Sequence, residues 1–189
     1  MIKGDKVYLT AIEERDLETL RYWRNLHEYR KYSREYREIS ATMQKNWFEH
    51  IVNGDNSTIM FAIRMLGSDE LVGCCGLCYI NWVHRHSDLS LYIGKGESYI
   101  DSEGIAEESC KLLFDYGFHE IGLNKIWTEL YEFDHKKYDL YEKFEFQKDG
   151  FLRKQYFYEG KWWGSYILSL LSEEYGKNGW ILAGIRKER

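Results

Sequence analysis

The segment from Asp88 to Gly122 limits the possible folds of this chain more than any other segment. It opens with an alternation that puts Leu89, Leu91 and Ile93 on one side, as in a half-buried strand. A loop rich in Gly, Ser and Asp follows, and apolar residues then recur at helical spacing as far as Gly122, which is placed to cap a helix. A strand, a loop and a helix in this order direct unpaired backbone N–H groups to one point, the start of the helix. The segment predicts either a phosphate site or an ordinary connection, and its residues alone fit both.

Composition and charge narrow the class of protein. The chain has 189 residues, of which 17% are aromatic, so we expect one folded domain with a substantial core. The formal net charge of −5 argues against a dedicated nucleic-acid-binding protein, because such proteins are usually basic. The sequence has no apolar run long enough to span a bilayer, and its first residues lack the pattern of a signal peptide. We therefore expect a cytoplasmic protein that binds neither nucleic acid nor membrane.

The cysteines do not predict a metal site or a disulfide. Cys75 and Cys78 have the spacing of a redox or zinc pair, but residues 71–80 form a continuous apolar run that is typical of a buried strand. Neighbouring side chains of a strand point to opposite faces, so these two thiols diverge. We expect free, buried thiols and no metal ligands.

The rest of the chain reads as strands and helices without a linker or an internal repeat. Thr10 is placed to cap a first helix and Ser40 a second. The alternating run at 59–65 and the continuous apolar run from Leu71, joined by a turn at 67–69, predict a β-hairpin. Asp134 is placed to start a helix that ends near residue 144. The order is a strand, two helices, an antiparallel meander, a helix, a strand, a helix and two final strands. This order predicts an α+β fold.

Five sequence motifs occur in order along nearly the whole chain. They are RDLETLRYWRN at 15–25, LVGCCGLCYINWVHRHSDLSLYIG at 71–94, EGIAEES at 103–109, LYEKFEF at 140–146, and EGKWW followed by LSLLSEEY near the end. Together they resemble the GNAT superfamily of acetyl-CoA-dependent N-acetyltransferases, in its RimJ/RimL-like branch. The resemblance implies a GNAT-type domain over residues 1–175, with a mostly antiparallel twisted sheet of about seven strands flanked by helices. Residues 176–189 would form a C-terminal extension.

The resemblance implies acetyl-CoA as the acetyl donor and places its pyrophosphate at the start of the central helix. The family's loop pattern, Gln/Arg-x-x-Gly-x-Gly/Ala, falls on Asp101, Ser102, Glu103, Gly104, Ile105 and Ala106. Asp101 and Glu103 depart from that pattern, because acidic side chains repel a pyrophosphate unless they turn outward.

Two further contacts with the cofactor follow from the same resemblance. In the family, the pantetheine arm pairs with the backbone of the strand before this loop, which here ends with Leu91, Tyr92 and Ile93. The family's Asn after the following strand falls on Asp134, which also fits the role of a helix N-cap.

The resemblance also implies two catalytic residues. Tyr141, within LYEK, matches the family's general acid, which protonates the leaving sulfur; the alternative role is packing in the core. Asp88 matches an acidic residue that faces the reaction centre, and it is our first candidate for the base that deprotonates the amine. His84 and His86 are alternative bases because His titrates closest to neutral pH.

The identity of the acetyl acceptor is the property that the sequence predicts least specifically. Residues 24–37 interleave Arg, Tyr and Glu, which suits either the wall of an anion-binding pocket or a self-paired surface. We expect substrate contacts from Arg24, Asn25, Tyr32 and His84. The predicted acceptor is a primary amine on a small molecule, with an amino-sugar nucleotide ahead of a protein N-terminus or a polyamine. A non-catalytic acyl-CoA-binding module is the alternative function, and a homodimer is compatible with either.

Overall fold

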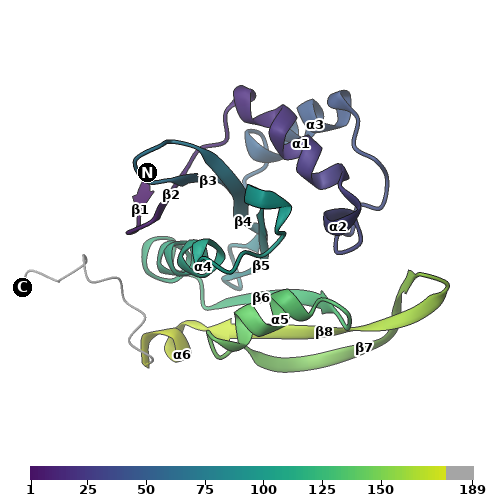
Figure 1. Cartoon of the computed structure of the whole chain (residues 1–189). Coiled ribbons are helices and arrows are strands. Elements are labelled where there is room, and N and C mark those ends of the chain that lie inside the picture. The colour runs from purple at the N-terminus through teal and green to yellow at the C-terminus, as the bar shows by residue number, and fades with distance from the viewer. Residues whose placement is uncertain (178–189) are drawn as a thin grey trace, which may run out of the picture.

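A single eight-stranded sheet organises the computed structural model, which describes residues 1–177 (Figure 1). Its strand order is β1-β2-β3-β4-β5-β6-β8-β7, and among the described strands only β5 and β6 pair in parallel. The strands are β1 (Ile2–Lys3), β2 (Val7–Thr10), β3 (Ile59–Met65), β4 (Leu71–Asn81), β5 (His86–Ile93), β6 (Lys125–Tyr131), β7 (Gln147–Tyr158) and β8 (Lys161–Leu171). The predicted α+β fold is confirmed, with one strand more than the seven expected because the short β1 pairs with β2.

Helices cover both faces of this sheet. They are α1 (Leu17–Asn25), α2 (His27–Arg30), α3 (Ala41–Trp47), α4 (Ile105–Asp115), α5 (His135–Glu142) and α6 (Ser172–Lys177). The first three lie together on one face, whereas α4 packs against β2, β4 and β5 on the other (Figure 1). Apart from residues 176 and 177, which end α6, the expected extension lies outside the described residues, so a domain boundary at 175 stays a prediction. No helix within residues 1–177 is long and apolar enough to cross a membrane.

The first helix starts later than the sequence suggests. Ser40 caps α3 as expected, because its hydroxyl oxygen accepts a hydrogen bond from the N–H of Met43 at 3.2 Å. Thr10 was the wrong cap, since it pairs with Ala62 in the ladder between β2 and β3. A one-turn 3₁₀ helix at Glu14–Asp16 leads into α1, and the N–H of Glu13 donates to Asp16 Oδ2 at 3.0 Å.

Two apolar clusters, one on each face of the sheet, hold the helices in place. The alternation of β4 puts Cys75 into the cluster beneath α4 and Cys74 into the cluster beneath the first three helices. All four cysteines are free, and burial raises the pKa of the Cys74 and Cys78 thiols to about 12. The prediction of free thiols is confirmed, and their burial keeps them protonated at neutral pH.

The sheet opens between β5 and β6. These two parallel strands pair only through residues 86–88 of β5 and 125–127 of β6 within the described chain, and they separate beyond Asp88. The N–H of Gly94 donates to the carbonyl of Val72 in β4 at 2.7 Å. Because adjacent amides of a strand point in opposite directions, the N–H and C=O of Ile93 point into this opening. We call it the β5–β6 opening; α4 begins beside it (Figure 1).

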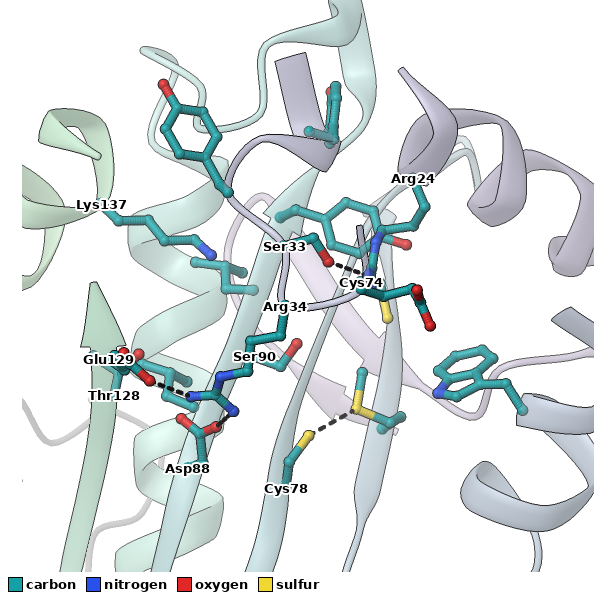
Figure 2. A pocket seen from close by; sticks show the side chains of 18 of the residues that line it. Arg24, Ser33, Arg34, Cys74, Cys78, Asp88, Ser90, Thr128, Glu129 and Lys137 are labelled. Atoms are coloured by element: carbon teal, nitrogen blue, oxygen red, sulfur yellow. Dashed lines mark hydrogen bonds and ion pairs between the residues drawn. The ribbon is translucent and has the colours of Figure 1, made fainter. Parts of the chain in front are cut away.

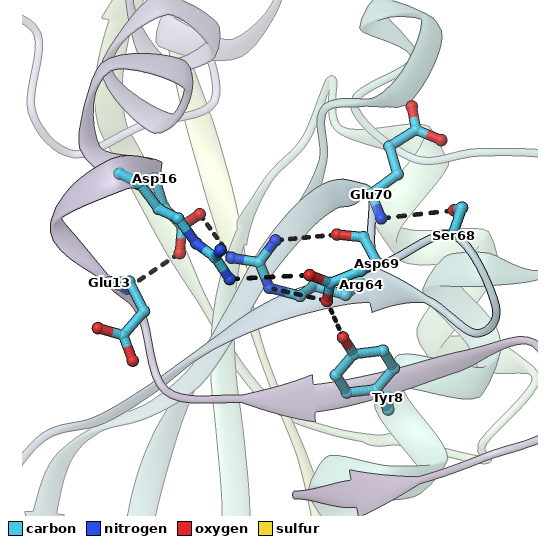
Figure 3. A network of polar contacts seen from close by, with 8 residues as sticks. Tyr8, Glu13, Asp16, Arg64, Ser68, Asp69 and Glu70 are labelled. Atoms are coloured by element: carbon cyan, nitrogen blue, oxygen red, sulfur yellow. Dashed lines mark hydrogen bonds and ion pairs between the residues drawn. The ribbon is translucent and has the colours of Figure 1, made fainter.

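A buried ion pair ties the start of α1 to the sheet. Arg64 on β3 donates through Nη2 to Asp16 Oδ1 at 2.6 Å, and both side chains are about 95% buried, with exposures of 6% and 4%. Arg64 Nη1 also donates to the carbonyl of Asp69 at 3.0 Å, and the Asp69 carboxylate accepts a hydrogen bond from the Tyr8 hydroxyl (Figure 3). The network thus joins β2, β3, the β3–β4 turn and the segment that leads into α1.

Replacement of Asp16 by Ala should lower the free energy of unfolding by about 3–5 kcal/mol, because it leaves the buried Arg64 guanidinium without its carboxylate. Urea unfolding at neutral pH measures this loss. Glu14→Ala is the matched control, since Glu14 is an exposed acid two residues earlier. Equal losses in the two variants would show that the buried pair has no special role.

Candidate active site

A cavity of about 560 Å³ lies beside the β5–β6 opening on the face that carries α1 to α3. Segments far apart in the sequence line it: the end of α1, the loop after α2, strands β4, β5 and β6, and helix α5 (Figure 2). Its charged side chains come from all of these segments except β4, and they include both signs. They are Arg24, Arg34, Glu35, Asp88, Glu129 and Lys137.

Two carboxylates hold one guanidinium inside this cavity. Arg34 donates through Nη1 to Asp88 Oδ2 at 2.6 Å, and its Nη2 lies 3.8 Å from Glu129 Oε2 (Figure 2). Asp88 is 5% exposed, and its second oxygen, Oδ1, has no hydrogen-bond partner among residues 1–177. Burial raises the pKa of the Asp88 carboxyl, although the Arg34 charge opposes this shift. The predicted base is therefore in the cavity and has a spare acceptor oxygen.

Two more cations face the cavity. Arg24 points inward from α1 with its guanidinium 5.8 Å from the centre of the Tyr92 ring, and it also donates to the Ser33 hydroxyl. Lys137 extends from α5, and its Nζ lies 5.0 Å from the centre of the Tyr99 ring (Figure 2). Burial lowers the pKa of the Lys137 ammonium, and nearby carboxylates partly offset that shift. The cavity wall thus carries both signs of charge, in patches.

Tyr141, the predicted general acid, lies one helical turn after Lys137 on α5. Its side chain is fully buried and stacks on Phe146 with ring centres 5.2 Å apart. Burial raises its pKa well above the usual value, so the hydroxyl stays protonated at neutral pH. In the described part of the chain this hydroxyl has no hydrogen-bond partner. A buried hydroxyl without a partner is costly, which makes this group a candidate for contact with a ligand.

The Asp101 carboxylate binds the backbone N–H groups at the start of α4. Asp101 accepts hydrogen bonds from the N–H groups of Glu103 at 2.8 Å, Ile105 at 2.9 Å and Ala106 at 2.7 Å. Gly104 adopts a φ of +88°, which only glycine reaches without strain. Glu103 turns outward instead, to Lys95 Nζ at 3.2 Å, and Ser102 is exposed. The Asp101 side chain therefore faces the N–H groups at the start of α4, whereas the Glu103 side chain points away from them.

Tyr99 fills the β5–β6 opening. Its carbonyl accepts from the N–H of Ile93 at 2.8 Å, and its own N–H donates to the Tyr29 hydroxyl at 3.1 Å. That hydroxyl in turn donates to the carbonyl of Ile93 at 2.6 Å. The Tyr99 hydroxyl donates to Asp134 Oδ2 at 2.7 Å, while Asp134 Oδ1 caps α5 by accepting from the N–H of Lys137 at 3.2 Å. The backbone of Ile93 and the carboxylate of Asp134 therefore already have partners within the chain.

Four of the remaining predicted substrate and cofactor residues line the cavity: Leu91, Tyr92, Arg24 and Tyr32. Tyr32 also stacks on Tyr99 with ring centres 4.4 Å apart.

The structure does not bring Asn25 and His84 to the cavity. The Asn25 side chain binds the backbone of Ile39 through its nitrogen at 2.9 Å and its oxygen at 2.7 Å, so it holds the loop that carries Arg34. His84 lies in the exposed turn between β4 and β5. Sequence reasoning included Arg34 only as one of the arginines of the 24–37 segment. It did not find Glu129, Lys137 or Tyr99, since none lies in a motif that specifies its partner.

Comparison with known proteins decides the family. Residues 9–167 match the model of the acetyltransferase (GNAT) domain. The chain belongs to the GNAT acetyltransferase family.

Two curated relatives agree with this assignment. An uncharacterized N-acetyltransferase, p20 of Bacillus licheniformis, is 30% identical over 61% of this chain and 63% of its own length. The spermidine N(1)-acetyltransferase of Escherichia coli K12 is 25% identical over 72% of this chain and 77% of that enzyme.

Solved structures of a third relative establish the fold. Spermidine N-acetyltransferase from Vibrio cholerae in complex with CoA and spermine superposes with a TM-score of 0.80, at 24% identity, over 91% of this chain and 99% of that one. Another structure of the Vibrio cholerae enzyme is described as dodecameric.

GNAT acetyltransferases use acetyl-CoA, and the backbone here fits such a cofactor. The N–H groups at the start of α4 already converge on an anionic group, the Asp101 carboxylate, as they would on a phosphate. The N–H and C=O of Ile93 can pair with an amide chain laid along the β5–β6 opening. These backbone groups belong to Ile93, Ile105 and Ala106, which the sequence predicted as cofactor contacts, and in this structure Asp101 and Tyr99 already bind them.

Replacement of Tyr141 by Phe should leave the free energy of unfolding unchanged or raise it by about 1 kcal/mol, because the variant removes a buried hydroxyl without a partner. Tyr99→Phe, the matched control, should lower it by about 1 kcal/mol because it breaks the bond to Asp134. Chemical unfolding of both variants measures the difference. An equal loss in Tyr141→Phe would mean that its hydroxyl is bonded within the folded chain.

Proposed function

We propose that this chain acetylates a primary amine of a small molecule that carries positive charge, of the polyamine class. One observation carries the choice: the cavity holds the Arg34 guanidinium between the Asp88 and Glu129 carboxylates. A guanidinium on an alkyl stem has the same charge as an alkylammonium and, like it, only donates hydrogen bonds. The names of relatives that act on spermidine support the same class.

The roles of the cavity residues follow from their position and charge. Bound acetyl-CoA supplies a thioester carbonyl that an uncharged amine can attack. The Asp88 carboxylate, with one oxygen free of hydrogen bonds, accepts the proton that the ammonium must lose first. Its raised pKa makes it a stronger base than an exposed carboxylate, and this ability is lost as the pH falls through that pKa. Tyr141 holds a proton on its hydroxyl oxygen for the sulfur that leaves.

An amino-sugar nucleotide is the second candidate acceptor. Arg24 and Lys137 on the cavity wall favour it, because a diphosphate needs cations, and the cavity also offers tyrosine rings for a base. Two other arginines of the 24–37 segment have carboxylate partners: Arg34 binds Asp88, and Arg37 binds Glu35 at 2.7 Å. These pairs reduce the positive charge available to a diphosphate, so the cationic amine comes first.

Three finer assignments accompany this proposal. The five motifs support the RimJ/RimL-like branch, and the free cysteines support a reducing compartment, the cytoplasm. Self-association as a homodimer or a larger assembly is supported by the dodecamer of the Vibrio cholerae relative.

A panel of acceptors tests the substrate class by following thiol release from acetyl-CoA. We expect turnover of spermidine and little turnover of 4-amino-sugar nucleotides or N-terminal peptides. Glu129→Gln should raise KM for spermidine about 5- to 50-fold with kcat nearly constant, because it weakens ground-state binding of the ammonium.

Glu142→Gln, at an exposed position of α5, is the control and should change neither constant. Turnover of the sugar nucleotide alone would reject the polyamine class. Turnover of no acceptor, with CoA bound, would favour a non-catalytic binding module.

A further inference from the structure

We propose that residues 95–103 plug the cofactor site of the free protein, so that acetyl-CoA binds only when Tyr99 and Asp101 leave the positions they hold here. The inference rests on the cofactor of the GNAT family and not on the acceptor proposed above. It makes the two side chains internal competitors that set the affinity for the cofactor.

Asp101 stands where a pyrophosphate would bind. Both of its oxygens face the start of α4, where they accept from Ile105 and Ala106 of the helix and from Glu103 before it. These donors cannot serve a carboxylate and a phosphate at once, and the two negative charges repel each other. Cofactor binding must therefore break the three hydrogen bonds of Asp101.

Tyr99 stands where the amide arm would bind. It makes an antiparallel bridge to Ile93, on the side of β5 that faces away from β4, and so uses the backbone groups exposed in the β5–β6 opening. Its ring is 4% exposed and stacks on Tyr32. Its hydroxyl donates a hydrogen bond to the carboxylate of Asp134, which is the third group expected to contact the cofactor. A chain of amides laid along this opening has to replace the Tyr99 backbone.

The same displacement would free Tyr141. Tyr99 lines the cavity, whereas Tyr141 is fully buried and its hydroxyl has no hydrogen-bond partner within residues 1–177. Both tyrosines lie close enough to Asp134 for its charge to raise their pKa values. In this structure Tyr141 is not among the residues that line the cavity. The plug therefore hides a group that the proposed chemistry needs.

Backbone strain and exposed contacts in residues 95–103 favour the displacement of this loop. Glu97 and Tyr99 have φ values of +50° and +63°, a region that costs non-glycine residues free energy. Three hydrogen bonds near solvent join the loop to other elements: Lys136 Nζ to the carbonyl of Ser98 at 2.9 Å, the Tyr22 hydroxyl to Glu97 at 2.8 Å, and Lys6 Nζ to the carbonyl of Glu103 at 2.7 Å. Backbone strain and contacts near solvent lower the cost of moving the loop.

Calorimetric titration with CoA, without any acceptor, tests the proposal. Asp101→Ala should bind CoA about 2- to 30-fold more tightly than wild type, which corresponds to the usual value of one helix cap. Glu103→Ala is the matched control: it removes the same charge two residues away, but its carboxylate faces Lys95 and not the helix. Asp101→Asn, which keeps a capping oxygen, should give a smaller gain and guards against misfolding of the Ala variant.

The outcomes separate the proposal from the function. Equal affinities of Asp101→Ala and Glu103→Ala, in a wild type that binds CoA, would overturn the plug and leave the acetyltransferase function intact. A gain in CoA affinity that is confined to the Asp101 variants supports the plug. Failure of wild type and all variants to bind millimolar CoA would overturn both.

Discussion

The separation of β5 from β6 beyond Asp88 is the constraint on which the rest of this structure depends. Two parallel strands that stop pairing leave backbone donors and acceptors in the middle of a sheet, where they need partners. The protein meets that need with Tyr29 and Tyr99, which together satisfy both groups of Ile93. The separation also places Asp88, the last residue of β5 that pairs with β6, at the edge of the cavity. The candidate base, the cavity and the cofactor site thus share one structural cause.

The charges of the site show a second pattern: each of the two proposed ligand sites holds a side chain that has the charge of the proposed ligand. Asp101 lies on the N–H groups of α4, and Arg34 lies between Asp88 and Glu129. Both arrangements satisfy groups that would otherwise be unpaired, so both stabilise the free protein at the expense of binding. Among the buried polar atoms without a hydrogen-bond partner in the described chain are two from predicted catalytic residues, Asp88 Oδ1 and Tyr141 Oη. These are the atoms to which the proposed chemistry assigns a proton to accept and a proton to donate.

Sequence patterns predicted the parts of this structure that local periodicity controls. The alternation of β3, β4 and β5, the cap at Ser40 and the order of elements all follow from side-chain spacing. The position of Asp101 in the loop was also predictable, but the direction of its carboxylate was not, because that depends on the path of residues 95–103.

The long-range contacts could not be predicted from a single sequence. Arg34 and Asp88 are 54 residues apart, and no local pattern links them. Thr10 was misassigned because a residue that fits a cap also fits the end of a strand, and pairing with Ala62 decides between them. Tyr99 lies in a segment without periodicity, so only the fold shows that it fills the β5–β6 opening.

Amide hydrogen exchange of the whole protein, with and without saturating CoA, tests the central claim most directly. In the free protein the N–H groups of Tyr99 and Ile93 are both bonded, through Tyr29 and Tyr99. If the cofactor displaces an internal plug, CoA should speed exchange in a peptide covering residues 95–103 and slow it at the start of α4. Slower exchange in both segments, or no change in residues 95–103, would contradict the account.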